Sequence, residues 1–198
     1  DKICNFSENN LHLLGYSIPF QGEVSLAELK KHLYTLPEQP NAIPYITSYY
    51  KERWGFCLTQ EQYDILEEGT YTVYIDTKLF DGVLNYAELL IKGKSKNEIF
   101  LSTYVCHPSM ANNELSGPTV VTFLAKWLTQ MQTLEYSYRI VFIPETIGSI
   151  TYLSLNYEEM KKKVIGGFNV SCVGDDRAYS YLPSRSGNTI SDLVARHV

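Results

Sequence analysis

Cysteine is scarce in this sequence, and the spacing of the few cysteines is informative. The four cysteines, at positions 4, 57, 106 and 172, are widely separated, and no two of them form a CxxC pair. Cys106 and Cys172 lie in apolar runs, where a free cysteine behaves as a small hydrophobic side chain. The pattern excludes a disulfide framework and indicates reduced thiols in a cytoplasmic protein.

Long apolar runs and an excess of basic charge are also missing. No segment approaches the roughly 18 apolar residues of a membrane span, and no signal-peptide pattern is present, so we expect no membrane partner. The net charge of −5 gives no basic face for a nucleic acid. What is present, 44 % hydrophobic and 20 % charged residues among 198, is typical of a globular protein with a core.

Both ends of the sequence look cut. The chain begins at Asp1 rather than at Met, and residues 190–198 have the pattern of an unfinished amphipathic helix. We therefore expect part of the native protein, and functional residues with it, to lie outside these 198 residues.

Residues 1–93 are rich in proline, tyrosine and short elements. A capping box that begins at Ser25 predicts a helix over 26–34. A second capping box, which begins at Thr59, predicts a helix that stops near Gly69. Between these two helices, prolines force an extended connection.

Two strands are predicted at the end of the same half. Residues 70–77 and 83–91 have the composition and alternation of strands, and an Asp81-Gly82 turn signal separates them. We interpret the two strands as a β-hairpin. Residues 1–93 are thus predicted to form a small α+β module with a hairpin at its end.

Residues 94–198 alternate between apolar strands and amphipathic helices. Strands are predicted over 99–105, 138–143 and 165–173, and helices over 116–132, 146–155, 158–163 and from about Thr189. Alternation at this spacing favours an α/β fold with a mostly parallel sheet, right-handed crossovers and flanking helices.

Acidic or histidine side chains follow each of these three strands. His107 comes directly after the first strand, with Glu114 further along the same loop. Glu145 follows the second strand, and Asp175 follows the third. Because ligands of open α/β sheets bind at the carboxyl ends of the strands, we expect these side chains to meet in one crevice. Together they suit a metal such as zinc.

Each of these residues also has a purely structural explanation. His107 could be a satisfied core histidine, and Glu114 could be a first-turn acid that complements a helix dipole. Glu145 could cap the helix that follows it. Asp175 and Arg177 could form an ion pair in a surface turn. The sequence alone leaves these alternatives open.

Nucleophilic catalysis has weaker support. No GxSxG nucleophile elbow is present. Cys106 precedes His107, but neighbours on a strand point to opposite faces, so we expect that the two side chains do not meet easily. Ser116 is a candidate helix cap and Pro118 fits the first turn, and such a helix N-terminus favours an anion.

The run from Ser102 to Gly117, STYVCHPSMANNELSG, resembles the signature of a bacterial family of aminopeptidase-like proteins, often encoded with polysaccharide-biosynthesis genes. Further likeness to the family is found in residues 36–40, 49–57, 144–149 and 172–181. Members resemble two-metal zinc aminopeptidases, carry an inserted β-rich domain and end in a winged helix. The resemblance implies a zinc-exopeptidase-like core over 94–198 and an inserted module over 1–93.

The correspondence with the zinc aminopeptidases is partial. Their His-x-Asp motif retains only His107, and Asn113 aligns with their bridging aspartate, which leaves Glu114 as the nearest carboxylate. Glu145 aligns with the general base of their Glu-Glu-x-Gly motif, and Asp175 lies a few residues beyond the position of a later ligand. The departures from these motifs fit a single-metal site, or a site without metal, better than a two-metal site, so we expect one zinc ion rather than two where metal is bound.

The first functional hypothesis is a metal-dependent amide hydrolase of aminopeptidase type. His107, a carboxylate (Glu114 or Asp175) and a residue expected outside these 198 would hold zinc, and Glu145 would be the general base. The substrate would be a small peptide or an aminoacyl or acyl-amino-sugar compound. Substrate contacts are expected from Asn112, Asn113, Asp176 and Arg177.

The second hypothesis is a catalytically inactive, peptidase-like binding or regulatory protein. In it, His107 and Glu145 would hold a peptide or sugar-linked ligand without turnover, since a fold does not imply a function. A third hypothesis assigns a glycan- or peptide-binding face to the tyrosines of residues 1–93. We favour the alternative that this module covers the crevice and shapes access to it.

Overall fold

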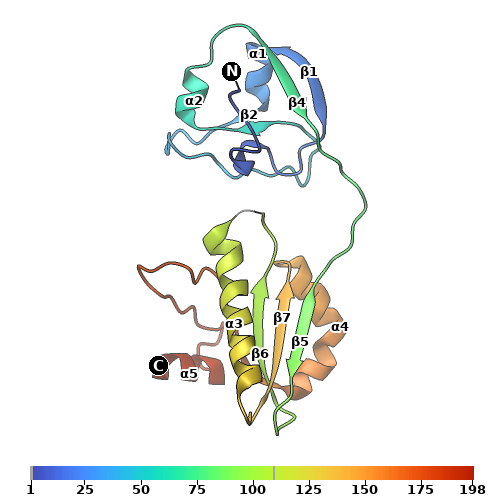
Figure 1. Ribbon diagram of the computed structural model, residues 1–198, viewed down its shortest axis with the longest axis vertical. Helices are drawn as coiled ribbons and strands as arrows, with labels where there is room; N and C mark the ends of the chain where they lie inside the picture. Colours follow the sequence, from blue (N-terminus) through green and yellow to red (C-terminus); the bar gives the residue numbers. More distant parts are fainter. Residues whose placement is uncertain (1, 109) are drawn as a thin grey trace. The chain divides into compact units, whose positions relative to one another are not determined.

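The computed structural model describes residues 2–108 and 110–198, and the chain forms two compact units. The first unit ends at Gly82 and the second begins at Val83 (Figure 1). Residues 83–93, which we assigned to the first module, thus belong to the second unit.

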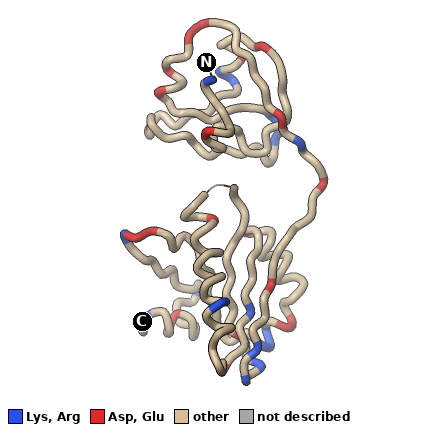
Figure 2. Tube along the Cα trace, viewed as in Figure 1, with Lys and Arg blue, Asp and Glu red and all other residues tan. Residues whose placement is uncertain are grey.

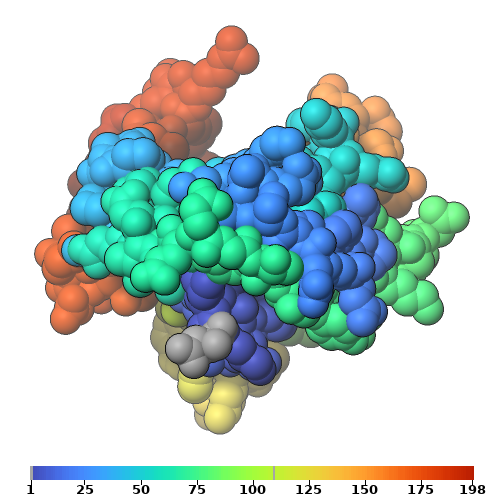
Figure 3. All heavy atoms as spheres, turned by 90° about the horizontal axis from the view of Figure 1, so that it is seen from above, coloured from blue at the N-terminus to red at the C-terminus, as the bar shows by residue number. Residues whose placement is uncertain are grey.

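The first unit is built from short helices and strands. Its elements are η1 (Asn10–His12), β1 (Phe20–Ser25), α1 (Leu26–Leu29), η2 (Lys30–His32), β2 (Leu33–Tyr34), β3 (Phe56–Cys57), α2 (Gln60–Asp64) and β4 (Thr70–Ile75). β1 pairs with β4 in antiparallel fashion, and β2 pairs with β3 in parallel. In a space-filling view these elements, coloured blue to turquoise, form one continuous body (Figure 3).

Side-chain caps begin the two short α-helices of the first unit. Ser25 Oγ accepts a hydrogen bond from the backbone N–H three residues further on, at 3.3 Å. Thr59 and Gln62 form a complete capping box in which each side chain accepts from the other's backbone N–H. The helix expected over 26–34 is nevertheless shorter, because its last residues leave it as β2 and pair with β3.

Aromatic stacking organises the core of the first unit. Its buried residues are Leu29, Trp54, Val73 and Ile75. The ring of Trp54 stacks on His32 at a centroid distance of 3.6 Å and on Phe20 at 4.3 Å. The indole therefore joins η2 and β1, which lie far apart from it in the sequence.

The second unit has a sheet of parallel and antiparallel strands, and helices pack against its faces. Its elements are β5 (Ala87–Ile91), β6 (Glu98–Tyr104), the π-helix η3 (Ala111–Leu115), α3 (Ser116–Gln130), β7 (Ser137–Ile143), α4 (Ile147–Lys163), β8 (Val164–Asn169) and α5 (Ile190–His197). The strand order is β5-β7-β6-β8. β6 is parallel to β7 and β8, whereas β5 is antiparallel to β7. The expected α/β class is confirmed.

The β-hairpin predicted over 70–91 is wrong. β4 pairs with β1, with Ile75 opposite Phe20, and β5 pairs with β7, with Ala87 opposite Phe142. Alternation of side chains shows that a segment suits a strand, but it does not name the partner strand. The two neighbouring strands therefore lie in different units.

Two other elements differ from the sequence-based expectation. The helical segments expected over 146–155 and 158–163 form one continuous helix, α4. The strand expected over 165–173 is β8, which ends at Asn169. Residues 170–173 lie outside the strand, although Val170 N still donates to the Ser102 carbonyl of β6 at 2.8 Å.

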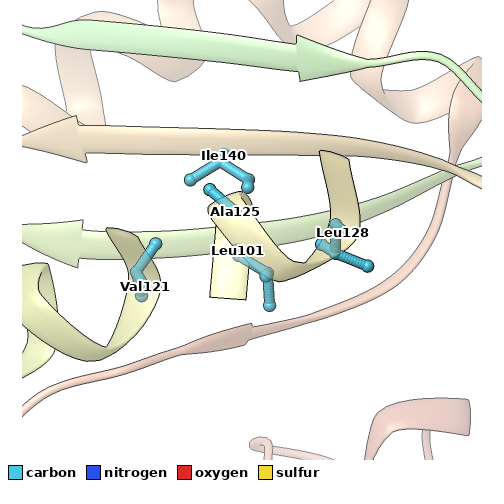
Figure 4. Close-up of a cluster of buried hydrophobic side chains, with 5 residues drawn as sticks. All are labelled: Leu101, Val121, Ala125, Leu128 and Ile140. Carbon is cyan, nitrogen blue, oxygen red and sulfur yellow. The ribbon is translucent and has the colours of Figure 1, made fainter. Parts of the chain in front are cut away.

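Alternate side chains of β7 point to opposite faces of the sheet and contact different helices. One cluster, under α3, consists of Leu101, Val121, Ala125, Leu128 and Ile140 (Figure 4). On the other face Val141 packs with Tyr152 and Met160 of α4. The two helices thus cover opposite faces of the sheet, and each fully buried aliphatic side chain stabilises the fold by about 1.5–3 kcal/mol.

A buried arginine ties the strands to α4. Arg139 on β7 is 4 % exposed and donates hydrogen bonds to Glu98 at 2.6 Å, to Glu88 at 2.7 Å and to Glu159 at 3.1 Å. The hydroxyl of Tyr152 donates to Glu88 at 2.8 Å. The hydrogen bond to Glu98 raises the pKa of Arg139, so the guanidinium stays charged. This network orders β5, β6 and α4 around β7.

Charged residues are spread over both units, and basic residues gather at the end of the second unit where β5 turns into β6 (Figure 2). Lys92, Lys94 and Lys96 lie in or beside this turn. This end is opposite the carboxyl ends of β6 and β7. Within the described residues, no helix combines the length and the apolar character needed to cross a bilayer.

Candidate functional site

The carboxyl ends of β6 and β7 lie side by side. The strands are parallel, with Tyr104 opposite Ile143, and the last bond between them runs from Val105 N to the Ile143 carbonyl at 3.1 Å. The chain then leaves both strands in loops. These loops carry His107 and Glu145, two of the residues that the sequence predicts for the site.

A cluster of possible metal ligands lies at this edge. One ligand atom each from Cys106, His107 and Glu145 lies within 4.8 Å of the other two. Cys106 and Glu145 are exposed, and His107 is half-buried. The structure thus brings together two of the predicted residues and adds a thiol.

The expectation that Cys106 and His107 do not meet is wrong, for a local reason. β6 ends at Tyr104, so both residues belong to the loop that follows the strand. The alternation of side chains applies only within regular strands. Outside β6 the backbone is able to turn both side chains toward Glu145.

Glu114, predicted as a metal ligand, holds two other groups. Its Oε1 lies 2.6 Å from Nδ1 of His107, and its Oε2 accepts a hydrogen bond from the Cys106 backbone N–H, also at 2.6 Å. Glu114 is 3 % exposed. Both carboxylate oxygens are therefore engaged below the loop, and among the described residues the cluster of ligand atoms does not include Glu114.

The two predicted substrate-binding asparagines lie on η3 and contact the segment after β8. Asn112 Oδ1 accepts from the Gly174 backbone N–H at 2.8 Å, and Asn113 Nδ2 donates to Cys172 Sγ at 3.7 Å. Ser116, which we expected to cap α3, instead accepts from the Val173 backbone N–H at 2.9 Å. These contacts join η3 to the loop after β8.

The acidic turn after β8 stands apart from the cluster. Asp175 pairs with Arg177 through several hydrogen bonds, and this pairing lowers the pKa of Asp175. Arg177 and Asp176 are exposed. Asp175 is not among the clustered ligand atoms of the described residues. The ion pair between Asp175 and Arg177 is the one that their structural explanation expected.

Gly117 lets α3 approach the sheet closely. A Cβ atom at this position would lie 2.3 Å from the Val170 carbonyl oxygen and 2.4 Å from Thr103 Oγ1. Such distances leave room only for glycine. The Ser-Gly pair in the sequence thus sets the start of α3, and η3 before it, against β6 and the chain leaving β8.

Comparisons with known proteins place the chain in a family. Residues 9–198 match the family described as "Domain of unknown function (DUF4910)". The chain belongs to the DUF4910 family. A relative from Clostridium acetobutylicum, described as a candidate polysaccharide biosynthesis protein with an aminopeptidase-like domain, is 47 % identical over 198 residues. The match covers 100 % of this chain and 45 % of that relative, so the chain spans less than half its length.

A solved structure gives the same result for the fold. The crystal structure of a candidate peptidase from Clostridium acetobutylicum, at 2.37 Å resolution, matches with a TM-score of 0.93 and 46 % sequence identity. The match covers 99 % of this chain and 46 % of that one. The resemblance to aminopeptidase-like proteins in polysaccharide biosynthesis is thus confirmed.

One residue beside the cluster of possible metal ligands was not predicted from the sequence. Tyr104, the last residue of β6, has its hydroxyl 3.8 Å from Cys172 Sγ. Loss of solvation, then the Cys172 thiol, raises the pKa of Tyr104 to about 12, and the charge of Glu145 acts in the same direction. The phenol is therefore a proton-bearing donor beside the cluster. Its place at the end of a buried strand was the signal that could have identified it.

Unusual backbone conformations occur on two sides of the DUF4910 site. Thr146, directly after Glu145, has a φ of 55°, and Cys172 has a φ of 52°. Non-glycine residues in this region cost about 1–3 kcal/mol each and are frequent at functional sites. The strain at Thr146 turns the chain sharply between Glu145 and α4.

Proposed function

We propose that this chain carries the catalytic centre of a metal-dependent amide hydrolase of aminopeptidase type that uses one zinc ion. The observation that supports the proposal most is the meeting of Cys106, His107 and Glu145 within 4.8 Å at the carboxyl edge of the sheet. In this proposal the second unit is a zinc-exopeptidase-like core, and the first unit is an inserted module.

The residues of the cluster fit a zinc ion. Zinc takes sulfur, nitrogen and carboxylate oxygen as ligands, and catalytic zinc sites keep one position open. Cys106 offers sulfur and His107 offers nitrogen as ligands, and the carboxylate of Glu145 lies with them at an edge that solvent reaches. We assign Cys106 and His107 to hold the ion. When bound, zinc would polarise the amide carbonyl as a Lewis acid.

Glu145 acts as the general base in this proposal. Its exposed carboxylate accepts a proton from the attacking water and passes that proton to the leaving amine. Thr146, with its positive φ, follows Glu145 at the turn into α4. Burial, with a smaller contribution from the charge of Glu145, raises the pKa of Tyr104, which keeps the phenol protonated.

The comparisons support the reaction class and suggest the substrates. The Clostridium acetobutylicum relative is named for an aminopeptidase-like domain and for polysaccharide biosynthesis, and the solved neighbour is a candidate peptidase. An amide bond in a small peptide, or in an aminoacyl or acyl-amino-sugar compound, fits both descriptions. The substrates and activity of the whole protein are part of this proposal.

The test combines a metal assay with the Glu145→Gln variant of the full-length protein. We expect about one zinc per chain, retention of zinc in the variant, and a fall in turnover of roughly 100- to 10,000-fold because a general base is lost. Zinc would be measured by elemental analysis, and turnover on aminoacyl and acyl-amino-sugar amides. Glu158→Gln, an exposed neighbour on α4, is the matched control. A clean full-length protein that takes up no zinc would contradict the proposal.

A second candidate function is a peptidase-like binding or regulatory protein without turnover. It is favoured by one observation: Glu114 and Asp175, two of the carboxylates expected to hold metal, have other partners. His107 and Glu145 would then hold a peptide or sugar-linked ligand. Metal-dependent turnover that His107→Ala removes would exclude this candidate.

A further inference from the structure

We infer that Glu114 is a positioning residue that fixes both His107 and Cys106 from below, rather than a ligand of the metal. The inference rests on the proposed function only where it takes Cys106 and His107 to be the groups that hold zinc. The geometry around Glu114 exists independently of any ion.

One carboxylate serves two neighbouring residues of the loop. Oε1 of Glu114 meets Nδ1 of His107, and Oε2 meets the backbone N–H of Cys106, each at 2.6 Å. These distances are at the short end of the range for hydrogen bonds to ionised groups, which are about twice as strong as neutral ones. The side chain of Glu114 thus fixes the orientation of the His107 ring and the position of the Cys106 backbone at the same time.

The Glu114 carboxylate is buried, so it needs fixed hydrogen-bond partners. Glu114 is 3 % exposed, whereas the side chain of His107 is 21 % exposed. A buried carboxylate is costly unless its oxygens are hydrogen-bonded, so the fold retains it only where partners are fixed. The partners are fixed here because a hydrogen bond from the Cys106 backbone N–H joins the loop after β6 to Glu114 on η3.

The π-helix η3 provides the position of Glu114. Glu114 lies one residue before the end of η3, and its backbone N–H bonds to the Met110 carbonyl at 2.8 Å. The next helix begins at Ser116, whose backbone N–H bonds back to the Ala111 carbonyl. π-helical turns are rare and are often found at functional sites. This wide turn holds the carboxylate under residues 106 and 107.

The contact selects one form of the histidine ring. An ionised carboxylate only accepts hydrogen bonds, so Nδ1 of His107 is the atom that donates. In the neutral ring Nε2 then carries the lone pair with which a histidine binds a metal. A carboxylate that orients a metal-binding histidine in this way contributes about 10- to 100-fold in metal affinity. Glu114 therefore acts on zinc through His107.

The tautomer of His107 is the decisive measurement, and it needs no metal. Long-range proton–nitrogen NMR spectra of the metal-free, histidine-labelled chain distinguish a proton on Nδ1 from one on Nε2. The chain contains four histidines, and His107→Ala identifies the signals of His107. We expect Nδ1 to carry the proton in the wild-type chain. A proton on Nε2 alone would overturn the inference.

The Glu114→Gln variant adds a second readout. We expect His107 to lose its preference for a proton on Nδ1 and the Kd for zinc to rise about 10- to 100-fold. Glu158→Gln removes one exposed charge and should change neither quantity. An unchanged tautomer and an unchanged Kd in Glu114→Gln would contradict the inference. If the wild-type chain binds no zinc, the proposed function fails, while the tautomer still decides the role of Glu114.

Discussion

The two units use their cysteines in opposite ways. In the first unit Cys57 is 1 % exposed, and burial raises its pKa to about 11. Burial, with a smaller contribution from Cys57, raises the pKa of Cys4 to about 12. In the second unit Cys106 and Cys172 are exposed, in the loops after β6 and β8. The first unit packs its reactive side chains into the fold, and the second presents them at the ends of strands.

The same contrast applies to the polar groups inside the second unit. Arg139 and its carboxylates lie on regular strands and on α4, where they hold the sheet together. Glu114 and His107 lie on a π-helix and in a loop, where they shape the site. In the second unit, the Arg139 network thus forms a framework that holds the sheet together, and the Glu114–His107 pair shapes the site. Variants of each pair can test this difference.

The largest expected effect comes from breaking the framework pair. Arg139→Met removes both guanidinium hydrogen bonds to the buried Glu98 and leaves that carboxylate with the longer 3.8 Å ion pair to Lys163, so the free energy of unfolding of the second unit should fall by about 3–5 kcal/mol. Hydrogen exchange of β6 and β7 in increasing urea would measure the loss. The exposed Arg185→Met is the control, and a loss below about 1 kcal/mol would contradict the framework role.

The framework was more predictable from the sequence than the site. The segments that became β6, β7 and α3 have strong apolar patterns, and each was predicted within a few residues of its observed bounds. The pairing of β4 and β5 was predicted wrongly, because pairing depends on β1 and β7, which lie far away in the sequence. Local patterns carry no information about distant partners.

The site was predictable only in part, for a related reason. His107 and Glu145 were found because they follow apolar strands, and the edge of a parallel sheet gathers such residues. The pair of Cys106 and His107 was discounted because the alternation of strand side chains was applied to them, although both follow β6, which ends at Tyr104. The contact of Glu114 with His107 depends on the π-helical turn, for which the sequence has no clear pattern.

The next effect concerns the thiols themselves. At pH 8 a thiol with a pKa of about 11 has about 100-fold less thiolate than one at the ordinary value of 9.0, so Cys57 should react about 100-fold more slowly in the folded chain than in urea. Cys4 should be slower still, whereas the exposed Cys106 and Cys172 should react first. Mass spectrometry of iodoacetamide-labelled peptides would measure all four. Fast labelling of Cys57 in the folded chain would break the comparison.

The same pKa shifts predict how the first unit responds to alkali. Because the folded-state pKa of Cys57 is raised, the folded unit keeps a proton that the unfolded chain loses near pH 9. The stabilisation is complete below pH 9 and is lost as the pH rises through about 11. The urea concentration at the unfolding midpoint of the first unit should therefore decrease as the pH rises from 9 to 11. Cys57→Ala should make this decrease smaller.

The smallest expected effect compares one helix cap from each unit. Thr59 caps α2 together with Gln62, and Thr189 caps α5 together with Asp192. Thr59→Ala should lower the free energy of unfolding by about 1 kcal/mol, at neutral and at acid pH alike, because no charged group takes part in its capping box.

Thr189→Ala should have a different effect, because the stabilisation at its cap depends on pH. Hydrogen bonds from Ser184, then Thr189, lower the pKa of Asp192, so their stabilisation is present above the ordinary aspartate pKa and is lost in acid. Hydrogen exchange of α2 and α5 at pH 7 and pH 3 would separate the two, and equal pH dependence would show that the two caps work alike.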